Sequence, residues 1–343
     1  MDDLRRLASA NGGVFSFADA SACGFTRSAV RHRVATGQWR RLRRGLMAES
    51  ALVDDGLPYD EVPNLVRVAA ALRAVGTAAA ASHHTAAAVL GLATYAAVPS
   101  FVAVTSPRQP ARSCQSLPWL RVRRSGLPDD QVWTVDGVRV TSPARTAVDI
   151  ARSSSLRAAV VVLDSALRAG ASPDELRRVV RMQARWPGVT RARQALVVAD
   201  PGSESPLESL AHVCQFEAGL PRPRTQVELF DSDGLVGRVD DCWAEYGVVG
   251  ESDGLLKYSA VDVLRREKLR QERLERLGLR VVRVTYRDVT TDAARTRARY
   301  RAAFPGAHFA ERVVVPRASG RRRSDHPVGV VDWVGDGGGR MGA

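Results

Sequence analysis

Three carboxylates in the last third of the chain have the types and spacing of a metal site. Asp240 ends one stretch of strand-like sequence, and Glu251 and Asp253 stand at alternate positions near the end of the next. Successive side chains of a strand point to opposite faces, so Glu251 and Asp253 project the same way and Asp240 can join them from a neighbouring strand. Such hard oxygen ligands suit Mg²⁺ or Mn²⁺. The spacing predicts a metal bound by Asp240, Glu251 and Asp253 that activates water against a phosphate.

Two further side chains complete the predicted catalytic set. Lys257 follows the acidic strand and is one of only two lysines, with Lys268, among 50 basic residues. A compact ammonium can orient the attacking water or stabilise charge on the phosphate, which a planar guanidinium does less well. Glu208 would reach the site from a preceding helix, directly or through water. Plainer roles stay open: Glu208 as part of a capping box and Asp253 as part of a turn.

These residues must be positioned by a small α/β unit. Ser205 and Pro206 have the types preferred at a helix N-cap and first turn, so a helix is expected to begin there. The patterns that follow predict a three-strand meander, a helix and a fourth, buried strand, at residues 225–230, 235–243, 248–253, 260–277 and 280–285.

That order of elements resembles the core of the PD-(D/E)xK nuclease fold, in its very-short-patch-repair endonuclease branch. The residues that carry the resemblance are Ser205-Pro206-Leu207-Glu208, Arg238-Val239-Asp240, Glu251-Ser252-Asp253-Gly254 and the stretch 277–284. The resemblance implies cleavage of DNA with Glu208, Asp240, Glu251, Asp253 and Lys257 as catalytic residues. The chain departs from the family in one respect. Lys or His usually stands two residues after the last acid, but here that position is Asp253 and the lysine is at 257.

The first fifty residues predict a winged helix-turn-helix. Two short helices, a turn at Gly24 and a third helix capped by Thr26 precede a basic hairpin. No acid occurs between Thr26 and Met47. Side chains at the start of the third helix reach base edges in such domains, and the wing meets phosphates. The predicted DNA-binding residues are Arg27, Ser28, Arg31, Arg40, Arg41, Arg43 and Arg44.

This segment also resembles the amino-terminal domain of AbiEi-like type IV antitoxins. Gly12-Gly13-Val14-Phe15, the stretch 24–30 and the wing 39–46 carry the resemblance, and Ser82-His83-His84-Thr85 and the stretch 141–149 extend it into the middle of the chain. The resemblance implies operator binding, autoregulation and a cognate nucleotidyltransferase toxin as a partner. His83 and His84 are expected at a helix start rather than in a catalytic or metal site, and Arg145 and Asp149 as a helical i, i+4 pair.

The composition sets the broad class. A net charge of +13 over 343 residues favours a polyanionic partner, here double-stranded DNA. The four cysteines are widely spaced, which argues against a zinc site or a disulfide framework. We expect a cytoplasmic protein without a signal peptide or membrane span, and the sequence leaves its oligomeric state open.

Together the patterns predict an α+β multidomain protein. Its expected parts are a winged helix-turn-helix at 1–52, a helical and mixed middle module at 58–200, an α/β restriction-endonuclease-like PD-(D/E)xK domain at 203–312 and a disordered tail at 316–343. Two functions are compatible with this organisation. The first is a Mg²⁺-dependent endonuclease targeted by the winged helix. The second is an AbiEi-like antitoxin and transcriptional autorepressor with a nuclease-like domain that does not cleave.

Overall fold

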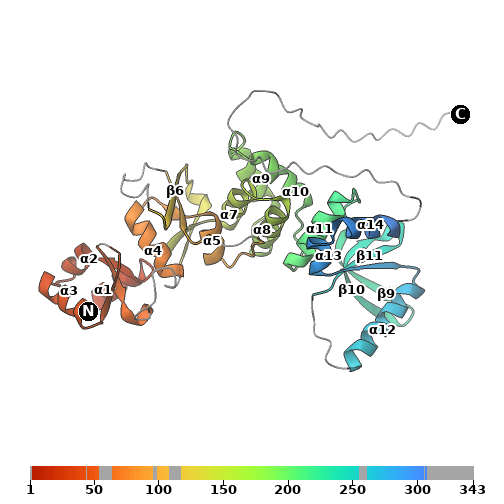
Figure 1. The fold of residues 1–343 in the computed structure, drawn as a ribbon, viewed down its shortest axis with the longest axis horizontal. Helices are drawn as coiled ribbons and strands as arrows, with labels where there is room; N and C mark the ends of the chain where they lie inside the picture. The colour runs from red at the N-terminus through yellow and green to blue at the C-terminus, as the bar shows by residue number, and fades with distance from the viewer. Residues whose placement is uncertain are drawn as a thin grey trace.

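The computed structural model describes residues 2–43, 45–53, 64–95, 99–107, 117–254, 261–304 and 306. Three separate β-sheets with accompanying helices follow one another along the chain (Figure 1). The expected mixed α+β multidomain class is therefore confirmed. The tail predicted at 316–343 lies outside the described residues. Among the helices that are described, none combines the length and apolar character that a membrane crossing requires.

The N-terminal module has the arrangement expected of a winged helix. Local signals set its helices, because the Thr26 side chain accepts a hydrogen bond from the backbone N–H of Ala29 and so caps the third helix. Phe15 and Phe25 both pack edge-on against Trp39 and form the centre of its core. The sheet order is β1-β3-β2, and the elements are α1 (Asp2–Ser9), β1 (Val14–Ser16), α2 (Phe17–Ala22), α3 (Arg27–Ala35), β2 (Trp39–Arg43), β3 (Leu46–Glu49) and the short η1 (Ser50–Leu52).

The second sheet belongs to the middle of the chain and has the order β6-β5-β4-β8-β7. Its elements are α4 (Asn64–Val75), β4 (Ala80–Ala81), α5 (His83–Val89), β5 (Val102–Ser106), β6 (Leu120–Arg124), η3 (Asp129–Gln131), β7 (Val132–Val135) and β8 (Val138–Thr141). The strand β4 consists of two alanines, a residue type that prefers helix. Ala80 and Ala81 pair with β5, and Ala81 also with β8, so tertiary pairing overrides the helical preference of alanine.

The first two modules are packed tightly together. Gly12 adopts a φ of +65°, and a Cβ there would lie 2.6 Å from Val138 and 2.9 Å from Ala69 in the second module. Arg73 of α4 forms an ion pair with Asp19 of α2 across the same junction. The winged helix is therefore held against the middle sheet by shape as well as by charge.

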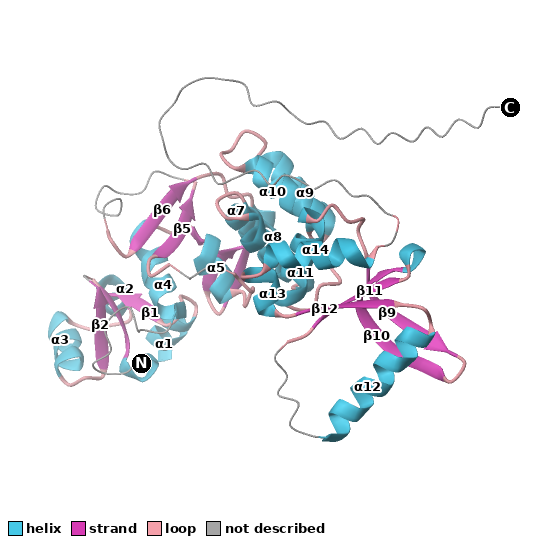
Figure 2. Ribbon diagram, turned by 45° about the vertical axis from the view of Figure 1, so that its right-hand side comes forward, coloured by secondary structure: helices cyan, strands magenta, loops and turns pink. Residues whose placement is uncertain are grey.

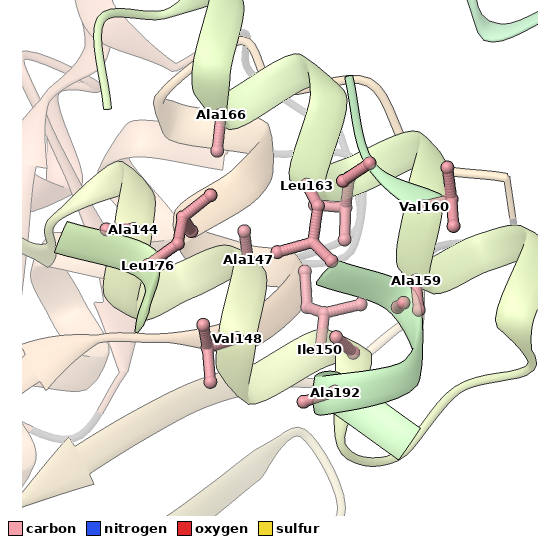
Figure 3. Close-up of a cluster of buried hydrophobic side chains, with 14 of the residues drawn as sticks. Ala144, Ala147, Val148, Ile150, Ala159, Val160, Leu163, Ala166, Leu176 and Ala192 are labelled. Atoms are coloured by element: carbon pink, nitrogen blue, oxygen red, sulfur yellow. The ribbon is translucent and has the colours of Figure 1, made fainter. Parts of the chain in front are cut away.

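A four-helix layer follows, formed by α7 (Pro143–Ala151), α8 (Leu156–Arg168), α9 (Pro173–Met182) and α10 (Val189–Val198). Small and branched side chains from all four helices meet in one buried cluster, among them Ala147, Leu163, Leu176 and Ala192 (Figure 3). The Arg145–Asp149 pair expected on α7 is confirmed at 2.8 Å, and both side chains are buried. No helix was predicted from the sequence at the position of α10.

The third sheet has the order β12-β11-β10-β9, with β11 and β12 parallel and the other pairs antiparallel. A cluster from α11, α13 and α14 fills one face, and Leu274 of α12 covers the other (Figure 2). The predicted helices and strands of this part are confirmed within a residue or two. They are α11 (Pro206–Glu217), β9 (Arg224–Asp231), β10 (Gly234–Trp243), β11 (Val248–Ser252), α12 (Val261–Arg276) and β12 (Arg280–Val284). The structure adds three elements that were not predicted, η4 (Ala244–Tyr246), α13 (Tyr286–Thr290) and α14 (Ala293–Ala303).

The stretch 200–204, which joins α10 to α11, is anchored in the folded interior by two of its residues. Asp200 and Ser203 are buried, and the backbone N–H of Asp200 donates to the Asp164 carboxylate of α8 at 2.8 Å. Val161 of α8 also packs into the apolar cluster under α11. The four-helix layer and the third sheet therefore share a core.

Candidate functional site

The predicted acidic site lies where β10 and β11 run side by side. Asp241 pairs with Gly250 in the antiparallel register, so Asp240 stands across from Glu251 on the same face of the sheet. The backbone N–H of Ser252 donates to Asp240 Oδ2 at 2.7 Å. Burial raises the pKa of Asp240 to about 6, the carboxylates of Glu208, Asp241 and Glu251 add to this rise, and the hydrogen bond from Ser252 opposes it. The structure thus brings Glu208, Asp240 and Glu251 within electrostatic reach of one another.

Glu208 is occupied by hydrogen bonds at the start of α11. Ser205 Oγ donates to one of its carboxylate oxygens at 2.7 Å, and the backbone N–H of Glu204 donates to the other at 2.7 Å. Gln226 Nε2 of β9 donates to that second oxygen at 3.0 Å. The side chain is therefore hydrogen-bonded at the start of α11, but to the N–H of Glu204 and not to that of the N-cap Ser205, which is not the reciprocal pairing of a capping box. Its charge still contributes to the raised pKa of Asp240.

Glu251 is held between two guanidinium groups. Arg270 of α12 binds one carboxylate oxygen, and Arg283 Nε of β12 donates to the other at 3.0 Å. The glutamate is 6% exposed, so these charged partners compensate the cost of burying it. Both oxygens of the expected metal ligand are therefore engaged by protein cations.

Of the other two predicted residues, the structure describes only Asp253. Asp253 lies just past β11, where its backbone N–H donates to the Val284 carbonyl at 2.9 Å. Lys257 lies outside the described residues. Within the ranges that the structure describes, no group of three or more acidic, histidine or cysteine side chains is arranged to hold a metal ion. In this arrangement the carboxylates do not fit the predicted three-ligand Mg²⁺ site, because Arg270 and Arg283 take the place of the cation beside Glu251.

A buried polar network, which was not predicted from the sequence, lies on the opposite face of the sheet. His212 of α11 donates from Nε2 to Asp241 Oδ1 at 2.7 Å, and its Nδ1 lies 3.0 Å from Ser203 Oγ. Gln215 Nε2 donates to the other Asp241 oxygen at 2.5 Å. Burial alone would lower the pKa of His212, but the charge and hydrogen bond of Asp241, together with Asp164 and Asp200, raise it to about 9.

This network resembles a serine–histidine–aspartate arrangement only in its residue types. A histidine whose pKa is about 9 is protonated at neutral pH and cannot accept a proton from serine. Ser203 is also fully buried, so no substrate reaches its hydroxyl. The network is a structural ion pair between protonated His212 and Asp241, at the junction of two modules. One sequence feature could have indicated this network: His212 follows Glu208 by four residues on the same helix.

Gln226 is a second residue that the sequence did not reveal. Its backbone φ is +53°, a conformation that costs about 1–3 kcal/mol for a residue other than glycine. The strain places its amide on Glu208, whereas its Oε1 is buried without a hydrogen-bond partner. No periodicity or composition signals a left-handed residue inside a strand.

The predicted DNA-binding residues of the winged helix differ in exposure. Arg27, Ser28 and Arg31 are exposed on α3, and Arg41 is exposed on β2. Arg40 is half-buried. Arg43 stacks 4.2 Å from the ring centre of Trp119 in the middle module, so this wing residue faces the protein. Arg44 lies outside the described residues.

The histidines expected at a helix start lie there, at the first two positions of α5. Burial lowers the pKa of His83 to about 4, an effect reinforced by Arg123, Arg152 and Arg145 and opposed by Asp149. A neutral, buried imidazole beside Ser82 Oγ packs as a core side chain.

The His212–Asp241 pair predicts a pH-dependent stability. The pKa of His212 rises from 6.5 to about 9 on folding, so its contribution is full below pH 6.5 and is lost as the pH rises through 9. Its size is about 3 kcal/mol at 1.36 kcal/mol for each pKa unit. We expect His212→Gln to lower the free energy of unfolding by about this amount at pH 6.5 and by much less at pH 10. Urea melts of both proteins measure it, with His32→Gln as the exposed control, and an equal loss at both pH values would contradict the assignment.

The ionised Asp240 carboxylate is expected to destabilise the folded protein, whereas protonated His212 stabilises it. The pKa of Asp240 is raised to about 6 by folding, so the protein loses stability as the pH rises from about 4 to 6. Asp240→Asn keeps an acceptor for the Ser252 N–H and removes the repulsion. After allowance for partial exposure, we expect it to stabilise the protein by about 1 kcal/mol at pH 8 and not at pH 4.5. Thermal melts at both pH values test this, with Asp233→Asn in the exposed hairpin turn as a control. Destabilisation at pH 8 would show that the carboxylate charge is needed.

Comparison with known proteins finds family matches in the N-terminal and middle parts of the chain. Residues 2–46 match a family described as "Transcriptional regulator, AbiEi antitoxin", and residues 75–198 match the family "AbiEi antitoxin C-terminal domain". Two proteins of Mycobacterium tuberculosis, from strains CDC 1551 / Oshkosh and ATCC 25618 / H37Rv and both named only as uncharacterized, are each 32% identical over 166 residues. Those residues make up 48% of this chain and 61% of each relative, so the alignment spans less than two thirds of the relatives.

A crystal structure of the RV2827C protein from Mycobacterium tuberculosis is similar over 66% of this chain and 87% of its own, at 16% identity and a TM-score of 0.37. The family matches cover α1 to α3 with most of the wing, and then β4 to α10. Both end before the third sheet. The N-terminal and middle parts of the chain are therefore similar to two domains of AbiEi antitoxin families.

Proposed function

We propose that this protein is a DNA-binding transcriptional regulator of the AbiEi antitoxin type, with double-stranded operator DNA as its partner. The observation that carries the proposal is the exposed basic surface of α3 and β2 within a segment that matches an AbiEi regulator family. A cognate nucleotidyltransferase toxin belongs to this proposal as the second partner.

The chemistry of α3 supports DNA contact. Its N-terminus carries the positive end of the helix dipole, and Arg27 and Ser28 stand in the first turn. Arg31 follows one turn later on the exposed side. A major groove admits a helix in this way, with the first turns nearest the base edges. Arg41 on the wing strand would then contact the phosphate backbone.

The C-terminal module fits a binding role better than a catalytic one in the described arrangement. A phosphodiesterase of the predicted kind needs Glu251 as a metal ligand, but Arg270 and Arg283 neutralise it. We therefore propose that this module does not cleave DNA while these ion pairs are formed.

The first test of the proposal is the salt dependence of binding. Replacing Arg31 and Arg41 by Ala removes two exposed cations, so operator affinity should fall and the slope of log K against log salt should flatten by about one unit for each lost phosphate contact. Electrophoretic mobility shift or anisotropy titrations at several salt concentrations, with upstream DNA of the gene as probe, measure both quantities. Arg295→Ala on the exposed side of α14 is the matched control. An unchanged slope in the double variant would place the DNA surface elsewhere.

A second candidate function is Mg²⁺-dependent hydrolysis of DNA. The observation in its favour is the proximity of Glu208 and Asp240, whose repulsion contributes to the raised pKa of Asp240 and would be relieved by a cation. Asp240 and Glu251 would hold the metal, with Asp253 as the third predicted ligand, and the ion would polarise the phosphate and acidify an attacking water. This function requires Glu251 to exchange an arginine for the metal.

Metal addition separates the two candidates. If the site binds Mg²⁺ or Mn²⁺, the melting temperature should be several degrees higher in millimolar metal than in EDTA, because a ligand that binds only the folded state stabilises it. Asp240→Asn should abolish that difference, and the wild type should cut plasmid DNA. If the melting temperatures are equal and the plasmid stays intact, the second candidate is wrong.

A further inference from the structure

A basic trough lies on the outer surface of α9 and α10, outside both sites considered above. A hollow of about 500 Å³ is lined by Arg177, Val180 and Arg181 from α9 and by Arg193, Leu196 and Val197 from α10. Each helix contributes residues spaced i, i+3 and i+4, which lie on one face. Arginines therefore form the rim, and aliphatic side chains form the floor.

The trough continues onto the C-terminal module. Val197 and Arg222 also line a second hollow, of about 460 Å³, whose wall includes Phe216, Leu220 and Pro221. Arg222 fixes this junction by donating to the Ala199 carbonyl at 2.6 Å and to Asp200 at 2.8 Å. A ligand lying along the trough would thus contact the four-helix layer and the third module at once.

The charge of the rim is largely uncompensated. Arg177 pairs with Asp174, but this pair is exposed and of little energetic weight. Within the described residues, Arg181 and Arg193 form no ion pair, and both are exposed. Positive charge without an internal partner, placed around an apolar floor, is an unusual combination for an ordinary solvated surface.

The apolar floor of the trough distinguishes between a nucleic acid and a protein helix as the bound molecule. Val197 is 60% exposed, and Leu196 is partly exposed beside it. A nucleic-acid backbone would satisfy the arginines but would bury little apolar surface over these side chains. An amphipathic helix with an acidic outer edge satisfies both, since it lays apolar residues into a groove while its carboxylates meet the rim. The helices α9 and α10 lie on the far side of the middle sheet from α3, away from the proposed DNA surface (Figure 1).

We propose that this trough binds an acidic amphipathic helix of a partner protein. The partner's leucine-like residues pack on Val197, Leu196 and Phe216. Its carboxylates pair with Arg181 and Arg193. The two hollows share Val197 and Arg222, so one helix lying on these residues contacts both. A helix of about 15 residues, roughly 22 Å long, serves as the probe length. The proposal is independent of the proposed DNA-binding function, because it uses neither the winged helix nor the acidic site.

The test uses the full chain and a defined probe. The probe is a fluorescein-labelled 15-residue peptide with Leu at i, i+3/i+4 and i+7 positions and Glu on its outer face. A scrambled peptide of the same composition and a 20-base-pair duplex serve as competing probes, all at 150 mM NaCl. We expect the amphipathic peptide to bind, the scrambled peptide to bind at least about tenfold more weakly, and Arg181→Glu/Arg193→Glu to reduce peptide affinity by about tenfold or more.

Control variants separate docking from misfolding and from general charge. Arg295→Glu makes the same kind of charge change on α14 and should leave peptide binding unchanged. Val197→Ser alters an exposed floor residue, so it should weaken the peptide without lowering the melting temperature. Equal affinity for the scrambled peptide, no binding of either peptide, or an unaffected Arg181→Glu/Arg193→Glu variant would each overturn the proposal. So would loss of duplex affinity in that variant without loss of peptide affinity, which would make the trough a nucleic-acid surface.

Discussion

The C-terminal half of the molecule depends on one buried cation, the protonated His212. It sits between Asp241 of β10 and Ser203 of the segment that leaves the four-helix layer, with Asp164 of α8 nearby. Removing either partner would leave a charge without compensation in a region of low polarity, which is costly. The pair therefore fixes α11 on the sheet and the preceding module on α11. The position of Glu208, one turn earlier on the same helix, follows from it.

Strand geometry gives the adjacent residues Asp240 and Asp241 different roles, one at the candidate site and the other in the buried network. Asp241 points to the α11 face and is consumed by the buried network, whereas Asp240 points to the other face, toward Glu251. Two adjacent aspartates thus have opposite electrostatic situations. One balances a buried cation, and the other carries a raised pKa among carboxylates. What distinguishes this face from an open metal site is the contribution of Arg270 and Arg283.

Local signals in the sequence were sufficient for much of the fold. Thr26, Ser142 and Ser205 are N-caps as their types and positions indicated, because capping depends only on residues within one turn. The strand β4 could not be foreseen, since two alanines form it only through pairing with strands distant in the sequence. For the candidate site, the convergence of Asp240 and Glu251 followed from strand alternation. The arginines on Glu251 did not, because they come from α12 and β12 and nothing local relates them to it. Lys257 stays a prediction outside the described residues.

The many arginines of this chain have several different roles. Arg145 is 3% exposed and donates to Asp149, Gln131, Ser125 and a backbone carbonyl, so it is a structural crosslink of the middle module. Arg270 and Arg283 neutralise a glutamate. Only the exposed arginines are accessible to a partner, and the surface beneath them differs between α3 and the pair α9 and α10. On α3 they project from a helix of a DNA-binding fold class, where phosphates are the natural complement. On α9 and α10 they surround exposed valine and leucine, and the desolvation of those side chains favours a partner that is itself partly apolar. Net charge alone would have assigned both surfaces to DNA, whereas the burial pattern separates them.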